Sequence, residues 1–148
     1  MRIALASDHA GFALKDELAA WLRDSGHTIL DLGTNSSDSV DYPEFGARLA
    51  NAVASGEAER GIAVCGSGIG ISIAVNRNPN CRCARVDDPL SARLSREHND
   101  ANVLALGGRL IGSDMARACV IEFLGTHFAG GRHQRRVDQL SQLLQESD

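Results

Sequence analysis

The feature of this sequence that most restricts its fold is the alternation of short apolar runs with longer stretches of helical periodicity. The largely apolar runs, each predicted to be a strand, fall at residues 2–6, 28–32, 61–64, 82–86 and 103–106. The helical stretches fall at residues 11–25, 41–55, 70–76, 88–98, 114–124 and 134–145. Strands alternating with helices form a parallel sheet that is covered on both faces. The alternation therefore predicts the α/β class: a three-layer α/β/α Rossmann-like sandwich with a five-stranded parallel sheet.

The length of the chain sets the expected number of domains. The chain has 148 residues, which is typical of one domain, and 43% of them are hydrophobic. That is enough apolar side chain to bury a core without disulfides or bound metal. We expect residues 1–148 to form a single domain.

Charge and hydropathy exclude several classes of partner. The 15 basic and 19 acidic residues leave a net charge of −4, which gives no long-range attraction to nucleic acid or to an acidic membrane. No segment approaches the ~20 apolar residues of a membrane span. The first predicted strand begins at residue 2, and the start of the sequence lacks the pattern of a signal peptide. We predict a cytoplasmic protein that binds neither nucleic acid nor membrane.

The four cysteines are expected to be reduced and to hold no metal. Cys81 and Cys83 lie two apart in a predicted strand, so their side chains point to opposite faces and cannot ligate one ion together. Together with Cys119 they are interpreted as ordinary small hydrophobic side chains. Cys65 differs because of its position at the end of the third predicted strand.

Ligands of parallel sheets bind outside the carboxyl ends of the strands, and the strongest motif lies there. The segment CGSGIG at residues 65–70 follows the third strand and opens a helix. Its glycines allow a sharp turn whose N–H groups point at a ligand. A thiol at such a turn has its thiolate stabilised and can act as a base, while the N–H groups stabilise an oxyanion. This equipment suits proton abstraction beside a carbonyl.

A dinucleotide-binding turn is the natural rival for this glycine segment. Such a turn follows the first strand of its fold and is paired with an acidic residue about twenty positions later. Here the turn follows the third strand, and no acidic residue ends the next one. Asp87 is near enough in sequence to keep this alternative open.

Three further segments carry candidate functional side chains. His9 follows the first strand within SDHAG, where the neighbouring polar side chains also suit a helix cap. His98 ends a helix before the fifth strand, a position that also suits a surface histidine stabilised by the helix dipole. Arg132 and Arg136 lie four apart, so they share one helical face and could grip a phosphate or form a solvated basic patch. Arg109 is a further cation at the ligand end of a strand.

Five motifs in this order resemble the type B ribose-5-phosphate isomerases and the related galactose- and allose-6-phosphate isomerases. They are SDHAGF at 7–12, DYP at 41–43, CGSGIGISIA at 65–74, SREHNDANVLA at 95–105 and GGRHQRRV at 130–137. The resemblance extends from residue 3 to about residue 137. Family members of one branch replace the cysteine by serine and use a glutamate further along the helix. Cys65 and Val75 place this chain with the cysteine branch.

The resemblance implies a role for each matching residue. Cys65 moves a proton between C2 and C1 of the sugar, Ser67 and the loop N–H groups hold the enediolate oxygen, and His98 opens the sugar ring. The implied backbone contacts with the substrate come from Gly66, Gly68, Ile69 and Gly70. Sugar hydroxyl contacts come from Asp8 and Asn99, the ring-opening side is lined by Asp41 and Tyr42, and the phosphate is bound by His9, Arg109, Arg132 and Arg136.

The resemblance also implies the assembly and the cofactor requirement. Family members are homodimers, sometimes tetramers, with active sites shared between subunits, and they use no cofactor or metal. Arg132 and Arg136 open a helix after the last strand, so reaching a site around strands one and three could require a second copy. The substrate expected is ribose 5-phosphate, in the pentose phosphate pathway. A six-carbon sugar phosphate, a flavodoxin-like nucleotide-binding module and a Cys–His hydrolase remain as alternatives.

Overall fold

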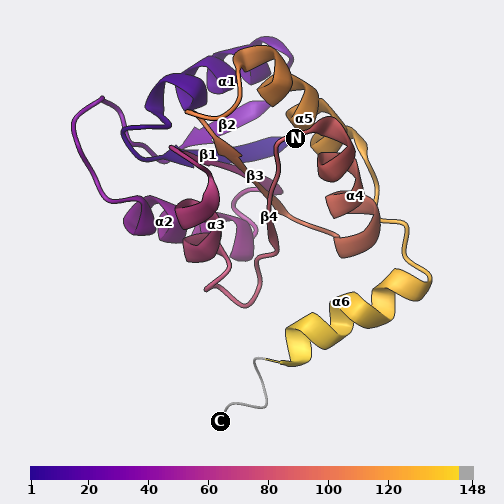
Figure 1. Cartoon of the computed structure of the whole chain (residues 1–148). Coiled ribbons are helices and arrows are strands. Elements are labelled where there is room, and N and C mark those ends of the chain that lie inside the picture. Colours follow the sequence, from indigo (N-terminus) through magenta and orange to yellow (C-terminus); the bar gives the residue numbers. More distant parts are fainter. Residues whose placement is uncertain (144–148) are drawn as a thin grey trace.

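A parallel sheet of five strands organises the computed structural model, which describes residues 1–143 (Figure 1). The strands are β1 (Arg2–Ser7), β2 (Thr28–Asp31), β3 (Arg60–Cys65), β4 (Cys83–Arg85) and β5 (Val103–Gly107). The helices are α1 (Phe12–Asp24), α2 (Tyr42–Ala54), α3 (Ile69–Val75), α4 (Pro89–Asn99), α5 (Ser113–Gly125) and α6 (Arg132–Gln142). The strand order is β2-β1-β3-β5-β4, and every neighbouring pair is parallel.

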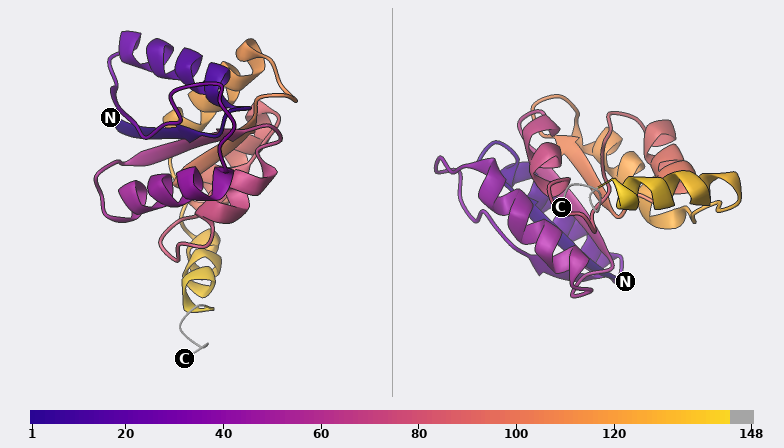
Figure 2. Two further views of the ribbon diagram at one scale, coloured as in Figure 1. Left: turned by 90° about the vertical axis from the view of Figure 1, so that its left-hand side faces the viewer. Right: turned by 90° about the horizontal axis from the view of Figure 1, so that it is seen from below.

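Helices cover both faces of the sheet, which confirms the predicted α/β/α sandwich. Helices α1, α4 and α5 lie on one face, and α2 and α3 lie on the other (Figures 1 and 2). One buried cluster joins the first set of helices to the sheet and includes Leu18, Leu104 and Phe123. The second includes Leu49, Ile71 and Val103. The three central strands are almost wholly buried, as apolar strands of a parallel sheet should be.

The predicted elements all occur, with small differences at their ends. Strand β4 is limited to Cys83–Arg85, shorter than the predicted 82–86, and lies at the edge of the sheet beside β5. Pro43 lies in the first turn of α2, where its missing N–H leaves no helical hydrogen bond unmade. Helix α6 begins at Arg132, two residues earlier than predicted, and residues 144–145 of that prediction lie outside the described residues.

Helix α6 differs from the others in its position. It projects from the body of the molecule beyond α4 and the β4 side of the sheet (Figures 1 and 2). Val137 is its buried residue, whereas Leu140 and Leu143 are exposed. None of the helices within residues 1–143 has the length and apolar character needed to cross a membrane.

Candidate active site

A cavity of about 350 Å³ opens at the carboxyl ends of the central strands. Its lining combines a thiol, a carboxylate, an imidazole, a phenol, a hydroxyl and a guanidinium. The lining residues are Asp8, His9, Ala10, Tyr42, Cys65, Gly66, Ser67, Gly70, Arg109 and Leu110. Eight of these ten were predicted from the sequence to belong to the site.

Hydrogen bonds between three loops give this cavity its shape. The loops follow β1, β3 and β5, which are adjacent in the sheet. The backbone N–H of Asp8 donates to the Val64 carbonyl at 3.3 Å, and that of Gly108 donates to the Cys65 carbonyl at 2.8 Å. Arg109 N–H donates to the Gly66 carbonyl at 3.0 Å. Residues that are far apart in the sequence are therefore held around one point.

Cys65 is the last residue of β3 and is only 4% exposed. The backbone N–H of Gly68 donates to its Sγ at 3.2 Å. Ser67 Oγ accepts from the N–H of Ile69 at 3.1 Å. Two of the N–H groups predicted to face a ligand are therefore engaged within the loop itself, on the thiol and on the Ser67 hydroxyl.

Two glycines are required by close approaches around the cavity. A Cβ on Gly70 would lie 2.6 Å from Cζ of the Tyr42 ring, so the bare backbone leaves the space that the ring occupies. A Cβ on Gly11 would lie 2.4 Å from the Val64 carbonyl oxygen, so this glycine lets the loop after β1 rest on β3. Both substitutions would push the cavity walls apart.

The polar side chains of the first loop are oriented by the backbone. Asp8 is 7% exposed, and its Oδ1 accepts from the N–H of Gly11 at 3.1 Å. Nδ1 of His9 lies 3.2 Å from both the backbone nitrogen and the carbonyl oxygen of Val40, in the segment before α2. Asp8 therefore closes the turn that leads into α1, and His9 is tied to the opposite wall.

Four other predicted site residues lie at the opposite edge of the sheet. His98 and Asn99 end α4, and Arg132 and Arg136 lie in α6. Helix α4 ends just before Val103, whose register partner in β3 is Gly61. Cys65 lies four residues further along β3, which corresponds to about 13 Å of strand. Within one chain, these four residues do not join the cavity around Cys65.

A histidine pair accompanies this second group. The rings of His98 and His133 stack with centroids 4.3 Å apart and planes inclined by 16°. Burial lowers the pKa of His133, and the positive charges of His98, Arg132 and Arg136 lower it further. Four cationic or ionisable side chains thus gather between the end of α4 and the first turns of α6.

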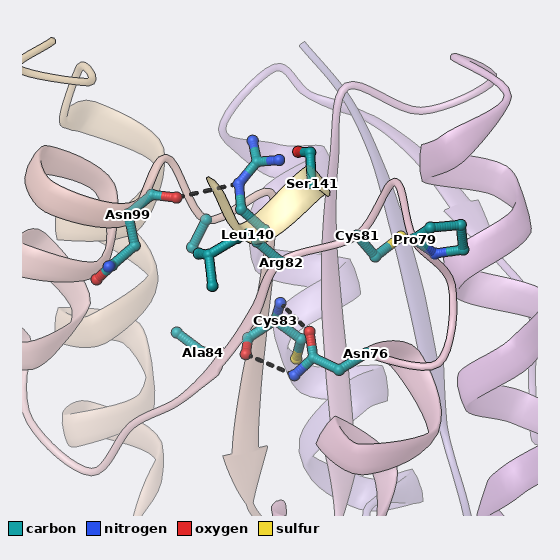
Figure 3. A pocket seen from close by; sticks show the side chains of 10 residues that line it. Asn76, Pro79, Cys81, Arg82, Cys83, Ala84, Asn99, Leu140 and Ser141 are labelled. Atoms are coloured by element: carbon teal, nitrogen blue, oxygen red, sulfur yellow. Dashed lines mark hydrogen bonds between the residues drawn. The ribbon is translucent and has the colours of Figure 1, made fainter. Parts of the chain in front are cut away.

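A second cavity, of about 320 Å³, lies between the far end of α6 and the segment that leads into β4 (Figure 3). Asn76, Cys83 and Asn99 line it together with Leu140. Asn76 is hydrogen-bonded to the backbone of Cys83 in both directions. Asn99 is in this wall, and Nε of Arg82 donates to its carbonyl at 3.0 Å.

The remaining predicted residues do not line the main cavity but neighbour residues that do. Asp41 is exposed at the N-cap of α2, beside Tyr42. Gly68 is buried behind the loop with a φ of 76°, a left-handed conformation that favours glycine, and Ile69 begins α3. Ala10, Leu110 and the stacking partner His133 were not predicted to have a role.

Among residues 1–143, no three His, Cys, Asp or Glu side chains gather closely enough to hold a metal ion. All four cysteines are free thiols.

Proteins of known structure and sequence resemble this chain over nearly its whole length. The model of the Ribose/Galactose Isomerase family matches residues 3–140. Ribose-5-phosphate isomerase B of Escherichia coli is 46% identical over 144 residues, covering 97% of each chain. The putative sugar phosphate isomerase YwlF of Bacillus subtilis is 44% identical over 142 residues, covering 95% of each.

Solved structures agree with these sequence relatives. Ribose-5-phosphate isomerase B of Clostridium thermocellum superposes with a TM-score of 0.99 at 47% identity, covering all of both chains. The enzyme of Mycoplasma genitalium, solved with bound ribulose-5-phosphate, superposes with a TM-score of 0.94 at 35% identity, covering 99% of this chain and 97% of that one.

Proposed function

The chain belongs to the ribose/galactose isomerase family, and from that membership we propose that it interconverts ribose 5-phosphate and ribulose 5-phosphate, with Cys65 as the base that moves a proton between C2 and C1. The observation that carries the proposal is the convergence of Cys65, Asp8, His9, Ser67 and Arg109 on one cavity. A thiol base, oxyanion donors and a cation for phosphate are the groups that an aldose–ketose shift needs. The reaction moves two electrons within one molecule, so it needs no redox cofactor.

The chemical step begins with the open-chain sugar. The Cys65 thiolate removes the proton from C2, a C1–C2 double bond forms, and negative charge develops on O1. Return of the proton to C1, with transfer of the O2 hydroxyl proton to O1, yields the ketose. The position of Cys65 at the rim of β3, 4% exposed and facing the cavity, supports this role.

Stabilisation of the enediolate is proposed for the loop that follows Cys65. Ser67 lines the cavity with its hydroxyl, and Gly66 and Gly70 bring their backbone close to the same space. Donors that are already oriented before charge develops lower the barrier without reorganising during the reaction. In the free enzyme, Cys65 Sγ and Ser67 Oγ accept hydrogen bonds from N–H groups of this loop. A bound substrate either takes over these N–H groups or forms hydrogen bonds in addition to them.

Phosphate binding is proposed for His9 and Arg109 on one side and for Arg132 and Arg136 on the other. Guanidinium groups bind phosphate in a bidentate way. Arg109 is exposed at the cavity, where a Cβ on Gly66 would lie 3.3 Å from its Nη1. Arg132 and Arg136 are also exposed and lie on one face of α6.

Ring opening is proposed for His98, with Asn99 binding sugar hydroxyls and Asp41 and Tyr42 lining that side. A histidine acts as acid and base near neutral pH. Its separation from Cys65, about 13 Å along the strands, prevents both side chains of one subunit from touching one pentose. The proposal therefore requires that His98 come from a second copy.

A homodimer with shared active sites meets this requirement, since a two-fold axis would supply both sites with a second half. The exposed projection of α6 supports it, because Leu140 and Leu143 are 47% and 64% exposed in the single chain. Apolar side chains on a projecting helix favour a partner surface. A tetramer, built from two such dimers, keeps the same sites.

An isomerase assay on the purified protein tests the proposal. Ribose 5-phosphate should be converted to ribulose 5-phosphate, and Cys65→Ala should retain less than about a tenth of the turnover, a loss above 1.4 kcal/mol. Cys119→Ala is the matched control, because it removes a buried thiol of α5 that lies outside the cavity. A wild-type protein that forms no ribulose 5-phosphate, or an active Cys65→Ala variant of native melting temperature, would contradict the assignment.

The same assay separates the alternatives. A six-carbon sugar phosphate differs from ribose 5-phosphate by one hydroxymethylene group, which changes the binding free energy by only a few kcal/mol. Ribose 5-phosphate and allose 6-phosphate are therefore compared by their kcat/KM values. A nucleotide-binding module would be inactive on both sugars and would not depend on Cys65. A Cys–His hydrolase would release product from an ester and leave ribose 5-phosphate unchanged.

A further inference from the structure

Arg85 is a charged side chain near the glycine loop that has no part in the reaction described above. It lies on the edge strand β4, and its side chain is 25% exposed. Nε donates to the backbone carbonyl of Ser67 at 3.0 Å. A second guanidinium nitrogen pairs with Asp87. The guanidinium is therefore directed at the backbone of the loop that carries the proposed oxyanion donors.

The peptide group that Arg85 holds also reaches the thiol. The Ser67 carbonyl and the Gly68 N–H belong to one peptide unit, and in a trans peptide these two groups point in opposite directions. On the far side, the Gly68 N–H donates to Cys65 Sγ at 3.2 Å. Arg85 and Cys65 thus lie at the two ends of the same peptide dipole.

Packing leaves this peptide little freedom to find another partner. A Cβ on Gly107 would lie 2.7 Å from the Ser67 carbonyl oxygen, and a Cβ on Gly68 would lie 2.8 Å from the Leu106 carbonyl carbon. The loop backbone therefore lies directly on the end of β5. In that crevice the Arg85 Nε–H is the donor to the Ser67 carbonyl, and a carbonyl without a partner there would be unfavourable.

We propose that Arg85 is a positioning residue for Cys65, which holds the Ser67–Gly68 peptide so that the Gly68 N–H points at the thiol sulfur. The inference rests on the function proposed above for Cys65. Hydrogen bonding to the carbonyl polarises the peptide and makes its N–H a better donor. Arg85 never touches the substrate, and its influence passes through one peptide group.

Other charged and titratable groups also face the thiol. Asp8 and His9 lie in the loop after β1, Tyr42 begins α2, and Arg109 follows β5. None of these four side chains is substituted in the experiment, so a change in Cys65 reactivity can be assigned to Arg85 and the peptide that it holds.

The experiment compares wild type, Arg85→Met and Arg85→Lys, with Arg23→Met as a charge-matched control. Arg23 is exposed in the last turn of α1. Alkylation of Cys65 by iodoacetamide is followed from pH 5 to pH 10 by mass spectrometry of the peptide that contains it. Burial raises the pKa of Cys81 and Cys83, and that of Cys119 to about 11, so these thiols react little at neutral pH. Turnover of ribose 5-phosphate is measured alongside.

We expect Arg85→Met to move the midpoint of Cys65 alkylation upward by about half to one pH unit, the effect of one hydrogen bond. Its kcat should fall roughly 5- to 10-fold with little change in KM. Arg85→Lys, which keeps a charged donor, should lie between Arg85→Met and wild type. Arg23→Met should match wild type in both measurements.

An Arg85→Met variant of native melting temperature with the wild-type alkylation profile overturns the inference. If that variant does not fold, a wild-type profile for Arg85→Lys overturns it instead. The alkylation profile is measured without substrate, so it tests the inference even if wild type fails to isomerise ribose 5-phosphate. A failure of the proposed function is seen only in the turnover of wild type and Cys65→Ala.

Discussion

Subunit mixing tests the shared site most directly. One inactive variant carries Cys65→Ala, and the other carries Arg132→Ala together with Arg136→Ala. Cys65 lies at the carboxyl edge of the sheet and the two arginines lie in the helix that projects from the opposite side. Each variant alone should be inactive or strongly impaired, because every site in either homodimer lacks one half.

The expected recovery follows from the arrangement of the halves. In a mixed dimer, one site combines Cys65→Ala with the altered arginines, and the other combines an intact Cys65 with intact arginines. Random exchange at equal concentrations makes half of the dimers mixed, and each has one intact site of two. Activity should therefore return to about a quarter of the wild-type value.

The assay follows ribulose 5-phosphate formation while the two variants exchange subunits. Native mass spectrometry of differently tagged chains measures the fraction of mixed dimers independently. The matched control mixes His98→Asn with the double arginine variant. These lesions lie in the same half of the site, near α4 and α6, so every site in that mixture is damaged and activity should stay absent.

A mixture that stays inactive after exchange has been demonstrated would refute the shared site. Each subunit would then carry a complete site, and the separation of His98 from Cys65 would have to be closed by a rearrangement within one chain. Recovery in the control mixture would equally refute the assignment of His98 and the arginines to one half.

Two further measurements address single residues. His98→Asn should lower turnover of cyclic ribose 5-phosphate by about 100-fold, as expected for loss of an acid–base group. Turnover of the open-chain ketose should fall much less. Equal losses in the initial rates of the two substrates would show that His98 does not open the ring. Burial raises the pKa of Cys119 from 9.0 to about 11, so the folded state holds its proton more tightly and stability falls as pH rises through the window from 9 to 11. The contribution to the free energy of unfolding is at most about 3 kcal/mol. Urea unfolding should show a smaller loss of stability between pH 9 and pH 11 for Cys119→Ala than for wild type. Parallel plots of stability against pH for the two proteins would disprove this linkage.

The order of strands in the sheet is the part of the fold that the sequence could not supply. Alternating apolar runs predict five strands and their helices, and the structure confirms them. The order β2-β1-β3-β5-β4 depends on which faces pack together, which local patterns do not encode. That order makes β1, β3 and β5 neighbours, and this is why the loops carrying Asp8, Cys65 and Arg109 meet.

Residues that act through the backbone or through stacking were also beyond prediction. Arg85 lies in a short strand that reads as a largely apolar core segment, and only the register of β4 beside β5 brings its guanidinium to the Ser67 carbonyl. His133 is one member of a basic run, and its stacking on His98 depends on the angle at which α6 leaves the body. Neither contact has a signature in residue spacing.

The split of the candidate site into two halves was, in contrast, implicit in the sequence. In a parallel sheet each crossover helix runs antiparallel to the strands, so its last residues lie at the amino edge of the sheet. His98 ends a helix just before the fifth strand, whereas Cys65 ends the third strand. One therefore belongs to the amino edge and the other to the carboxyl edge, whatever the strand order. For the proposed pair to act on one sugar, either a second subunit or a very long side chain would be needed, and histidine is short.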